Sequence, residues 1–132
     1  MTSNLLDRES LFDLLQHTYF DGIDHADADK AVQVFNEDAE WVHTQVWEHD
    51  SHDRRNTETL HGRKSIHEFL ARRIGEMQVV KIKHKVHSVL CDGKSGAFRA
   101  EVVGPEGDAL PFFGWVELEN QKISTYIIHP ER

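Results

Sequence analysis

The sequence predicts an α+β domain in which three helices from the first half of the chain pack on a curved antiparallel sheet. Apolar residues recur at helical spacing before residue 36 and again after residue 62. Elsewhere, runs rich in β-branched and aromatic residues are separated by turn signals. The 132 residues suit one domain, residues 1–132, which is large enough to bury its own core.

The first helix is predicted from about Leu5 to Ile23. Its buried stripe consists of apolar residues spaced three, four or seven apart: Leu5, Phe12, Leu15, Tyr19 and Ile23. The pattern breaks after Asp24, and Asp27 fits the N-cap of a short second helix that ends near Asn36. Two helices of unequal length therefore open the domain.

A short strand is predicted at residues 39–44, which are rich in aromatic and β-branched side chains. The polar stretch at residues 48–59 has no apolar anchor and is predicted to be an exposed loop. A third helix then follows the segment Leu60-His61-Gly62. Its buried face is predicted by four apolar residues: Ile66, Phe69, Leu70 and Ile74.

The clearest strand is predicted from Val79 to Cys91, because its even positions are largely apolar and its odd positions carry three lysines. Three more strands are predicted at residues 97–103, 110–119 and 123–129. Helices on one face of a curved antiparallel sheet tend to leave a cone with an apolar lumen. We therefore expect a small-molecule ligand in a central pocket.

Composition and charge exclude several functional classes. Cys91 is the only cysteine, which excludes an internal disulfide and a zinc site built from cysteines. The net charge of −8 is a poor match for nucleic acid, because binding to its backbone depends on neutralising phosphates. No run reaches the ~18 apolar residues of a membrane span. The first ten residues do not resemble a signal peptide, so we expect a cytoplasmic protein that binds neither nucleic acid nor membrane.

Two runs of sequence carry a family resemblance, YFDGIDHAD at residues 19–27 and VFNEDAEW at residues 34–41. Leu60-His61-Gly62, His84 and Lys122-Ile123 extend it over nearly the whole chain. With these features the chain resembles SnoaL-like proteins of the nuclear transport factor 2-like superfamily, which includes ketosteroid isomerase and small dehydratases. The resemblance implies a cone-shaped, cystatin-like α+β barrel with a pocket between helices and sheet, and a homodimer formed through the sheet face.

The ketosteroid isomerase pattern is matched at one position of three. Tyr19 corresponds to that enzyme's oxyanion-hole tyrosine. His43 stands where the enzyme has its general-base aspartate, and Gly114 stands roughly where it has a protonated aspartate. That aspartate is a known case of a carboxylic acid kept neutral by an apolar site. The resemblance therefore argues against steroid isomerisation as the activity.

The dehydratase-type members match better. Their pattern pairs Tyr-x4-Asp at the end of the first helix with a histidine on the long strand, and Tyr19, Asp24 and His84 occupy these positions. The resemblance implies that His84 removes a proton next to a carbonyl and that Asp24 orients the imidazole. Tyr19 would polarise an oxygen of the substrate or leaving group. Such a lyase or isomerase needs no cofactor.

Each of these residues also has a purely structural explanation. Tyr19 can be a core tyrosine, Asp24 a turn residue and His84 a core histidine whose ring is satisfied. The residues expected to bind substrate are Trp41, His43, Phe98, Phe112 and Trp115. We predict an acid–base enzyme for a small apolar, polyketide-like or steroid-like substrate. The alternatives are a non-catalytic small-molecule-binding protein and an interaction module that uses the sheet face.

No cofactor and no metal are expected. The chain has no glycine-rich phosphate loop and no HExxH motif. His49, His52 and His61 lie close together in the sequence, but a polar loop fixes no ligand geometry for them.

Overall fold

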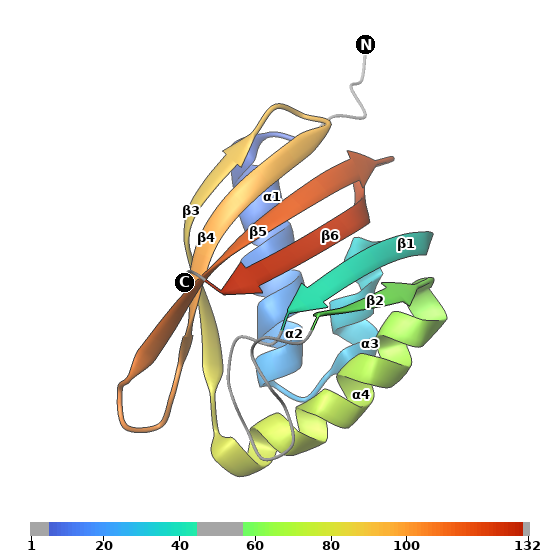
Figure 1. Ribbon diagram of the computed structural model, residues 1–132. Coiled ribbons are helices and arrows are strands. Elements are labelled where there is room, and N and C mark those ends of the chain that lie inside the picture. Colours follow the sequence, from blue (N-terminus) through green and yellow to red (C-terminus); the bar gives the residue numbers. More distant parts are fainter. Residues whose placement is uncertain (1–5, 45–56, 131–132) are drawn as a thin grey trace.

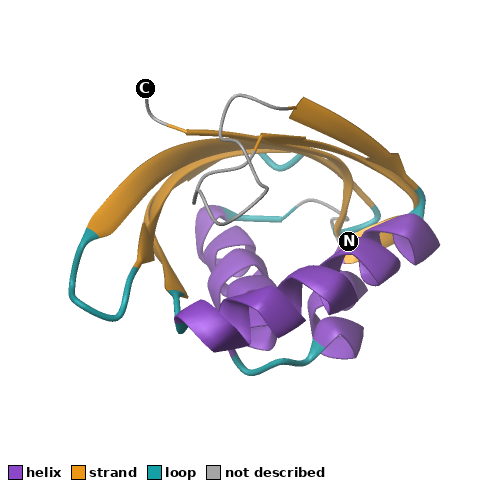
Figure 2. Cartoon of the chain, turned by 60° about the horizontal axis from the view of Figure 1, so that its bottom comes forward, coloured by secondary structure: helices purple, strands orange, loops and turns teal. Residues whose placement is uncertain are grey.

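A six-stranded sheet arches over a layer of helices in the computed structural model, which describes residues 6–44 and 57–130 (Figures 1 and 2). The first helical stretch is continuous and consists of α1, the π-helical η1 and α2. The helical elements are α1 (Arg8–Asp13), η1 (Leu14–Phe20), α2 (Asp21–Asp24), α3 (Ala28–Ala31), the 3-10 turn η2 (Val32–Val34) and α4 (Arg63–Val80). All helices lie on the concave side of the sheet, so the core forms between the two layers.

The sheet has the strand order β2-β1-β6-β5-β4-β3. Its strands are β1 (Phe35–Thr44), β2 (Thr57–His61), β3 (Lys83–Cys91), β4 (Ser95–Val103), β5 (Ala109–Glu119) and β6 (Lys122–Pro130). Neighbouring strands are antiparallel except for β1 and β6, which are parallel. The four consecutive C-terminal strands therefore form the antiparallel meander that the sequence predicts, and the first strand joins it at the β6 edge.

Asp7 is the N-cap of the first helical stretch, which begins at Arg8. The Asp7 carboxylate accepts a hydrogen bond from the backbone N–H of Ser10 at 2.7 Å. Three residues of the predicted stripe, Leu15, Tyr19 and Ile23, are buried. Phe12 is only partly buried, whereas the neighbouring Leu11 is fully buried, and Leu5 lies outside the described residues. The π-helical turns of η1 carry Tyr19, and such turns are frequent at functional sites.

The second helix is shorter than predicted. Asp27 is its N-cap, as expected, and accepts a hydrogen bond from the N–H of Lys30 at 3.0 Å. The helix gives way to a 3-10 turn, and β1 begins at Phe35, four residues before the predicted strand. Phe35 pairs with Ile123 of the parallel strand β6, and regular pairing resumes at Glu40, which pairs with Thr125, after an irregularity between the two.

The predicted loop at residues 48–59 is wrong at its C-terminal end. Thr57–His61 form β2, which pairs with β1 and closes that edge of the sheet. Tertiary pairing overrides the weak local signal of this polar segment. Residues 45–56, which include His49 and His52, lie outside the described part of the chain.

The long strand was also predicted too early and with one constant register. Helix α4 continues to Val80 and the strand starts at Lys83, so residues 79 and 80 are helical. A bulge between Val86 and Ser88 then shifts the alternation by one residue. Val89 is consequently buried, whereas Leu90 is 72% exposed on the outer face of the sheet. No helix in the described ranges is long and apolar enough to cross a membrane.

Candidate functional site

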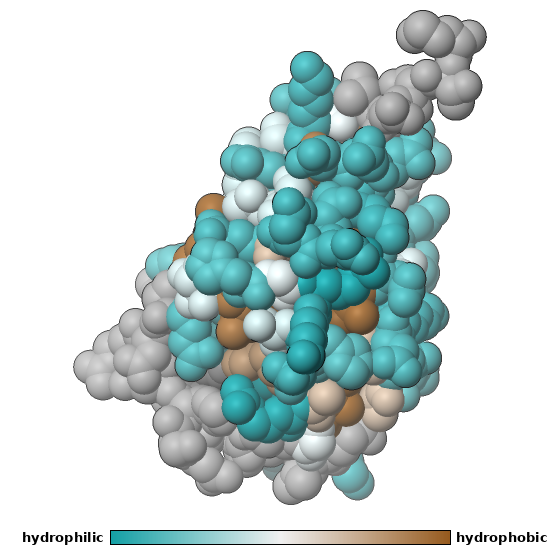
Figure 3. Space-filling model, turned by 90° about the vertical axis from the view of Figure 1, so that its right-hand side faces the viewer, coloured by the Kyte–Doolittle hydropathy of each residue, from teal (hydrophilic) through white to brown (hydrophobic). Residues whose placement is uncertain are grey.

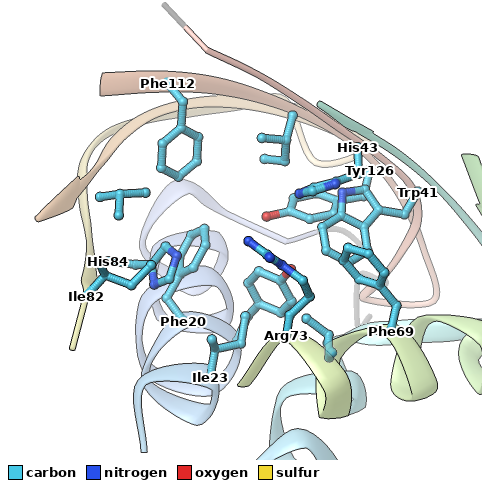
Figure 4. Close-up of a pocket in the computed structure, with 14 residues that line it drawn as sticks. Phe20, Ile23, Trp41, His43, Phe69, Arg73, Ile82, His84, Phe112 and Tyr126 are labelled. Atoms are coloured by element: carbon cyan, nitrogen blue, oxygen red, sulfur yellow. The ribbon is translucent and has the colours of Figure 1, made fainter. Parts of the chain in front are cut away.

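A cavity lies between the concave face of the sheet and the helices, with an empty volume of about 520 Å³ including the space at its mouth (Figure 4). The mainly aromatic and aliphatic lining is typical of a small-molecule site. Six lining residues carry polar groups: Tyr19, Trp41, His43, Arg73, His84 and Tyr126. They come from η1, β1, α4, β3 and β6, so the tertiary fold assembles the site from both ends of the chain.

His84 and Asp24 form a bidentate pair at the wall of this cavity. The His84 ring Nδ1 lies 2.7 Å from one carboxylate oxygen of Asp24, and the His84 backbone N–H donates to the other at 2.8 Å. Both side chains are 8% exposed. Because a carboxylate only accepts hydrogen bonds, Nδ1 carries a proton, and in the neutral imidazole the Nε2 atom keeps its lone pair.

Gln16 fixes the same segment of the edge strand. Its side-chain amide donates to the backbone oxygen of His84 at 3.2 Å, and its side-chain oxygen accepts from the N–H of Val86 at 2.7 Å. Asp24 and Gln16 thus replace the neighbouring strand that an edge position lacks. The ring of Phe20 stacks on the imidazole of His84, with centroids 5.0 Å apart. These contacts hold the imidazole in one orientation.

Tyr19 lines the cavity but does not contact the His84–Asp24 pair directly. It is 2% exposed, and its ring packs against those of Trp41 and Tyr126 with centroids 6.4 and 5.3 Å away. Burial raises the pKa of both phenols, Tyr19 and Tyr126, above the ordinary tyrosine value. Both hydroxyls therefore stay protonated at neutral pH and can donate hydrogen bonds into the cavity.

The sequence interpretation missed two polar lining residues, Tyr126 and Arg73. Arg73 is a charged residue that is only 4% exposed. Figure 4 shows its guanidinium group directed from α4 toward the middle of the cavity. A signal was available, because Arg73 follows Phe69 by four residues and therefore lies on the apolar face of the predicted third helix.

The five residues predicted to bind substrate divide into two groups. Trp41, His43 and Phe112 line the cavity. Phe98 is buried behind it, where its ring packs against those of Phe20 and Phe112. The prediction that Trp115 binds substrate is wrong. This side chain is 41% exposed on the opposite face of the sheet, because alternation along β5 points Phe112 inward and Trp115 outward.

Gly114 shows why an acid is missing at this position of the strand. A Cβ atom built on Gly114 would lie 2.2 Å from two ring carbons of Phe98, so the phenyl ring occupies the space of any side chain there. The aromatic ring at position 98 and the glycine at position 114 are thus complementary. The structure has no room for the neutral acid of ketosteroid isomerase at this point.

The described residues contain no cluster of three or more side chains suited to hold a metal ion. His61, one of the histidines considered for metal binding, lies 3.4 Å from the carboxylate of Glu40 on the neighbouring strand. His49 and His52 fall in the segment outside the described ranges.

The model of the SnoaL-like domain matches residues 17–126, which is most of the chain and includes every polar lining residue of the cavity. The chain belongs to the SnoaL-like domain family. No curated protein matches the sequence of this SnoaL-like domain.

Solved structures share the fold of the SnoaL-like domain. A proposed ketosteroid isomerase from Kribbella flavida has a TM-score of 0.68 and 17% identity, over 96% of this chain and 81% of that one. A protein of unknown function with a cystatin-like fold from Methylobium petroleophilum has a TM-score of 0.73 and 14% identity, covering 97% of this chain and 80% of that one. A proposed polyketide cyclase from Sinorhizobium meliloti has a TM-score of 0.62 and 18% identity, covering 89% and 94%. The predicted family and cone-shaped α+β fold are confirmed; fold alone does not determine the reaction.

Proposed function

We propose that this SnoaL-like domain is a cofactor-independent lyase or isomerase that acts by general acid–base catalysis on a small, largely apolar substrate. The observation that supports the proposal is the bidentate contact between Asp24 and His84 at the wall of an apolar cavity. A buried imidazole held by a carboxylate at Nδ1 is the usual arrangement of a general base.

In the proposed reaction, Nε2 of His84 takes a proton from a carbon next to a substrate carbonyl. Asp24 stabilises the imidazolium that forms, and the protonated phenol of Tyr19 donates a hydrogen bond to the enolate oxygen. The imidazolium then returns the proton. Delivery to another carbon completes an isomerisation, and delivery to a β-hydroxyl group releases water and completes a dehydration. Positioned proton transfer of this kind contributes about 10²–10⁴-fold to a rate.

Proton removal can be tested before the natural substrate is known. We expect the protein to catalyse deuterium incorporation next to the carbonyl of small ketones and β-hydroxy ketones in D₂O, measured by proton NMR. His84→Gln should abolish this exchange. The matched control is His87→Gln on the same strand, because His87 points outward and pairs with Glu101 at 2.9 Å.

Equal exchange by wild type and His84→Gln would contradict the proposal. Stabilisation of the protein by the same ketones without any exchange would indicate the alternative function, a non-catalytic small-molecule-binding domain.

The outer face of the sheet supports a proposal about assembly. Leu90, Ala97, Trp115 and Ile127 are register partners in turn and form one row across four strands. Trp115 and Ile127 are 41% and 37% exposed. Figure 3 shows, in contrast, mostly hydrophilic side chains on the side where β1, β2 and α4 lie. We propose that a second copy covers this apolar row, as soluble proteins rarely leave such patches open.

Trp115→Glu is expected to convert the proposed dimer to a monomer, because a charge replaces a large aromatic anchor at the centre of the row. Light scattering should report a fall from twice the chain mass to 15.3 kDa. Gln33→Glu adds the same charge on an exposed helical position and should leave the dimer intact. A wild-type protein that is monomeric at high concentration would contradict the proposal.

A further inference from the structure

The proposed proton transfer leaves two hydrogen-bond donors of the cavity unused. They are the indole N–H of Trp41 and the hydroxyl of Tyr126, and both residues line the cavity. Trp41 and Tyr126 are register partners on the neighbouring parallel strands β1 and β6, and their ring centroids are 5.3 Å apart. Figure 4 shows both side chains across the cavity from His84, with the hydroxyl of Tyr126 directed toward the middle.

Neither donor has a hydrogen-bond partner within the described part of the chain. The Nε1 atom of Trp41 and the hydroxyl oxygen of Tyr126 are both buried, in residues that are 4% and 1% exposed. Burial raises the pKa of Tyr126, and the neighbouring Tyr19 phenol raises it further without meeting hydrogen-bond geometry, so the hydroxyl keeps its proton. Because buried polar groups are normally satisfied, these two donors indicate a ligand that supplies an acceptor.

Aromatic neighbours hold the two donors in place. The Trp41 ring packs edge-on against Phe69, with centroids 5.4 Å apart, and stacks on Phe35 with centroids 6.4 Å apart. The Tyr126 ring stacks on Phe98 with centroids 6.3 Å apart. Rings enclosed in this way cannot turn their polar atoms to other partners without displacing their neighbours. The two donors therefore keep fixed positions.

We infer that Trp41 and Tyr126 together bind the oxygen of an uncharged carbonyl group, so that the ligand is a small neutral carbonyl compound with an apolar body. A carbonyl oxygen has two lone pairs and no proton, which matches two donors. Both donors are neutral, so they do not offset the cost of moving a carboxylate from water into an apolar lining. His43 and Arg73 also line the cavity, but both already have interaction partners, so neither is a vacant donor.

The carbonyl site rests on the proposed function for turnover but not for binding. A carbonyl oxygen held by Trp41 and Tyr126 directs the adjacent carbon toward the side of the cavity where His84 lies. The same donors then stabilise negative charge on that oxygen when the proton leaves, as preorganised donors do in a water-poor site. Binding of a carbonyl compound does not require His84, so the carbonyl site and the enzymatic activity can fail separately.

The experiment compares three molecules of nearly the same shape. They are acetophenone, α-methylstyrene, in which C=CH₂ replaces the carbonyl, and benzoate, in which O⁻ replaces the methyl group. Each is titrated by calorimetry against wild type and Tyr126→Phe at pH 7. Tyr126→Phe should weaken acetophenone binding by about 5-fold to 10-fold, the effect of one lost hydrogen bond, and change α-methylstyrene binding by less than about 2-fold. Benzoate should bind wild type more weakly than acetophenone does.

Thr125→Val is the matched control for Tyr126→Phe, because it removes a hydroxyl from the adjacent residue of β6, which does not line the cavity. Trp41→Phe should also weaken acetophenone binding selectively. Its control is Trp115→Phe, which removes an indole N–H that donates to Glu117 on the outer face of the sheet. Both controls should keep the wild-type affinities.

The indole N–H of Trp41 gives a direct readout in the wild-type protein. The chain has three tryptophans, so Trp47→Phe and Trp115→Phe identify the resonance of Trp41 by elimination in a proton–nitrogen correlation spectrum. This proton should move farther downfield with acetophenone than with α-methylstyrene, because only the ketone accepts a hydrogen bond. If Tyr126→Phe or Trp41→Phe does not fold, as judged by circular dichroism, this comparison decides.

The free protein provides a further check, because the hydroxyl of Tyr126 has no partner to lose. Tyr126→Phe should therefore not lower the midpoint of thermal unfolding. A lower midpoint, equal effects of Tyr126→Phe on acetophenone and α-methylstyrene, tighter binding of benzoate than of acetophenone, or no binding of acetophenone up to its solubility limit would each overturn the carbonyl site. Selective loss of acetophenone binding in Tyr126→Phe, with no deuterium exchange by wild type, would support the carbonyl site and contradict the enzymatic proposal.

Discussion

Asp24→Asn is expected to lower turnover by about 10⁴-fold while leaving the cavity in place, the size of effect that the same substitution has in serine-protease triads. The reason is the tautomer of His84. In the native pair, the two carboxylate oxygens accept from the backbone N–H and from the ring Nδ1 of His84. The amide of asparagine has one accepting oxygen and one donating NH₂ group. If the oxygen keeps the backbone contact, the NH₂ group faces Nδ1 and forces the ring proton onto Nε2, so the base is lost.

The measurement is the rate of deuterium incorporation into the ketone that wild type exchanges fastest. The His87–Glu101 pair on the outer face offers a matched control, because Glu101→Gln changes an equivalent carboxylate–imidazole contact outside the cavity. We expect that variant to retain the wild-type rate. A rate for Asp24→Asn within a factor of ten of wild type would show that Asp24 has only a structural role.

Gly114→Ala is expected to lower the free energy of unfolding by about 3 kcal/mol, the upper part of the range for an overpacked core. The new methyl group would lie 2.2 Å from ring atoms of Phe98, which is 3% exposed and cannot move without disturbing Phe20 and Phe112. The cost arises from this one ring and not from the backbone, which already lies in a regular strand.

A double-mutant cycle measured by urea unfolding checks this explanation. Phe98→Ala alone should cost about 3–5 kcal/mol, as is typical for a buried phenylalanine. In that background, Gly114→Ala should cost about 2 kcal/mol less than it does in wild type, because the methyl group then occupies vacated space. Equal costs of Gly114→Ala in both backgrounds would contradict the proposed complementarity of the two residues.

Much of the helical layer could be predicted because its signals are local. The spacing of Leu15, Tyr19 and Ile23 places them on one stripe, and all are buried. The short side chain of Asp27 caps the next helix as its position suggests. His84 stood out as a polar residue on an apolar strand face, and its pairing with Asp24 was expected from the family resemblance.

Errors occurred where a distant partner strand decides the local structure. Val86 and Leu90 would share a face in a regular strand, but the bulge opposite β4 sends Leu90 outward. Trp115 was predicted to bind substrate, whereas the strand alternation puts it on the outer surface. Arg73 was overlooked because a charged residue in a helix is normally solvated.

By itself the sequence determined the helical stripes, the turns, the strand-rich second half and hence the α+β class, since each depends on residues a few positions apart. Only the tertiary structure decided which side chains share the cavity. His84 meets Asp24 across 60 positions of sequence, and the contact depends on how the edge of β3 packs on the first helical stretch. Arg73 and Tyr126 are brought together by the same closure of helices over a curved sheet. The spacing of residues along a chain carries no information about such long-range contacts, because packing between helices and strands determines them, and local backbone preference does not.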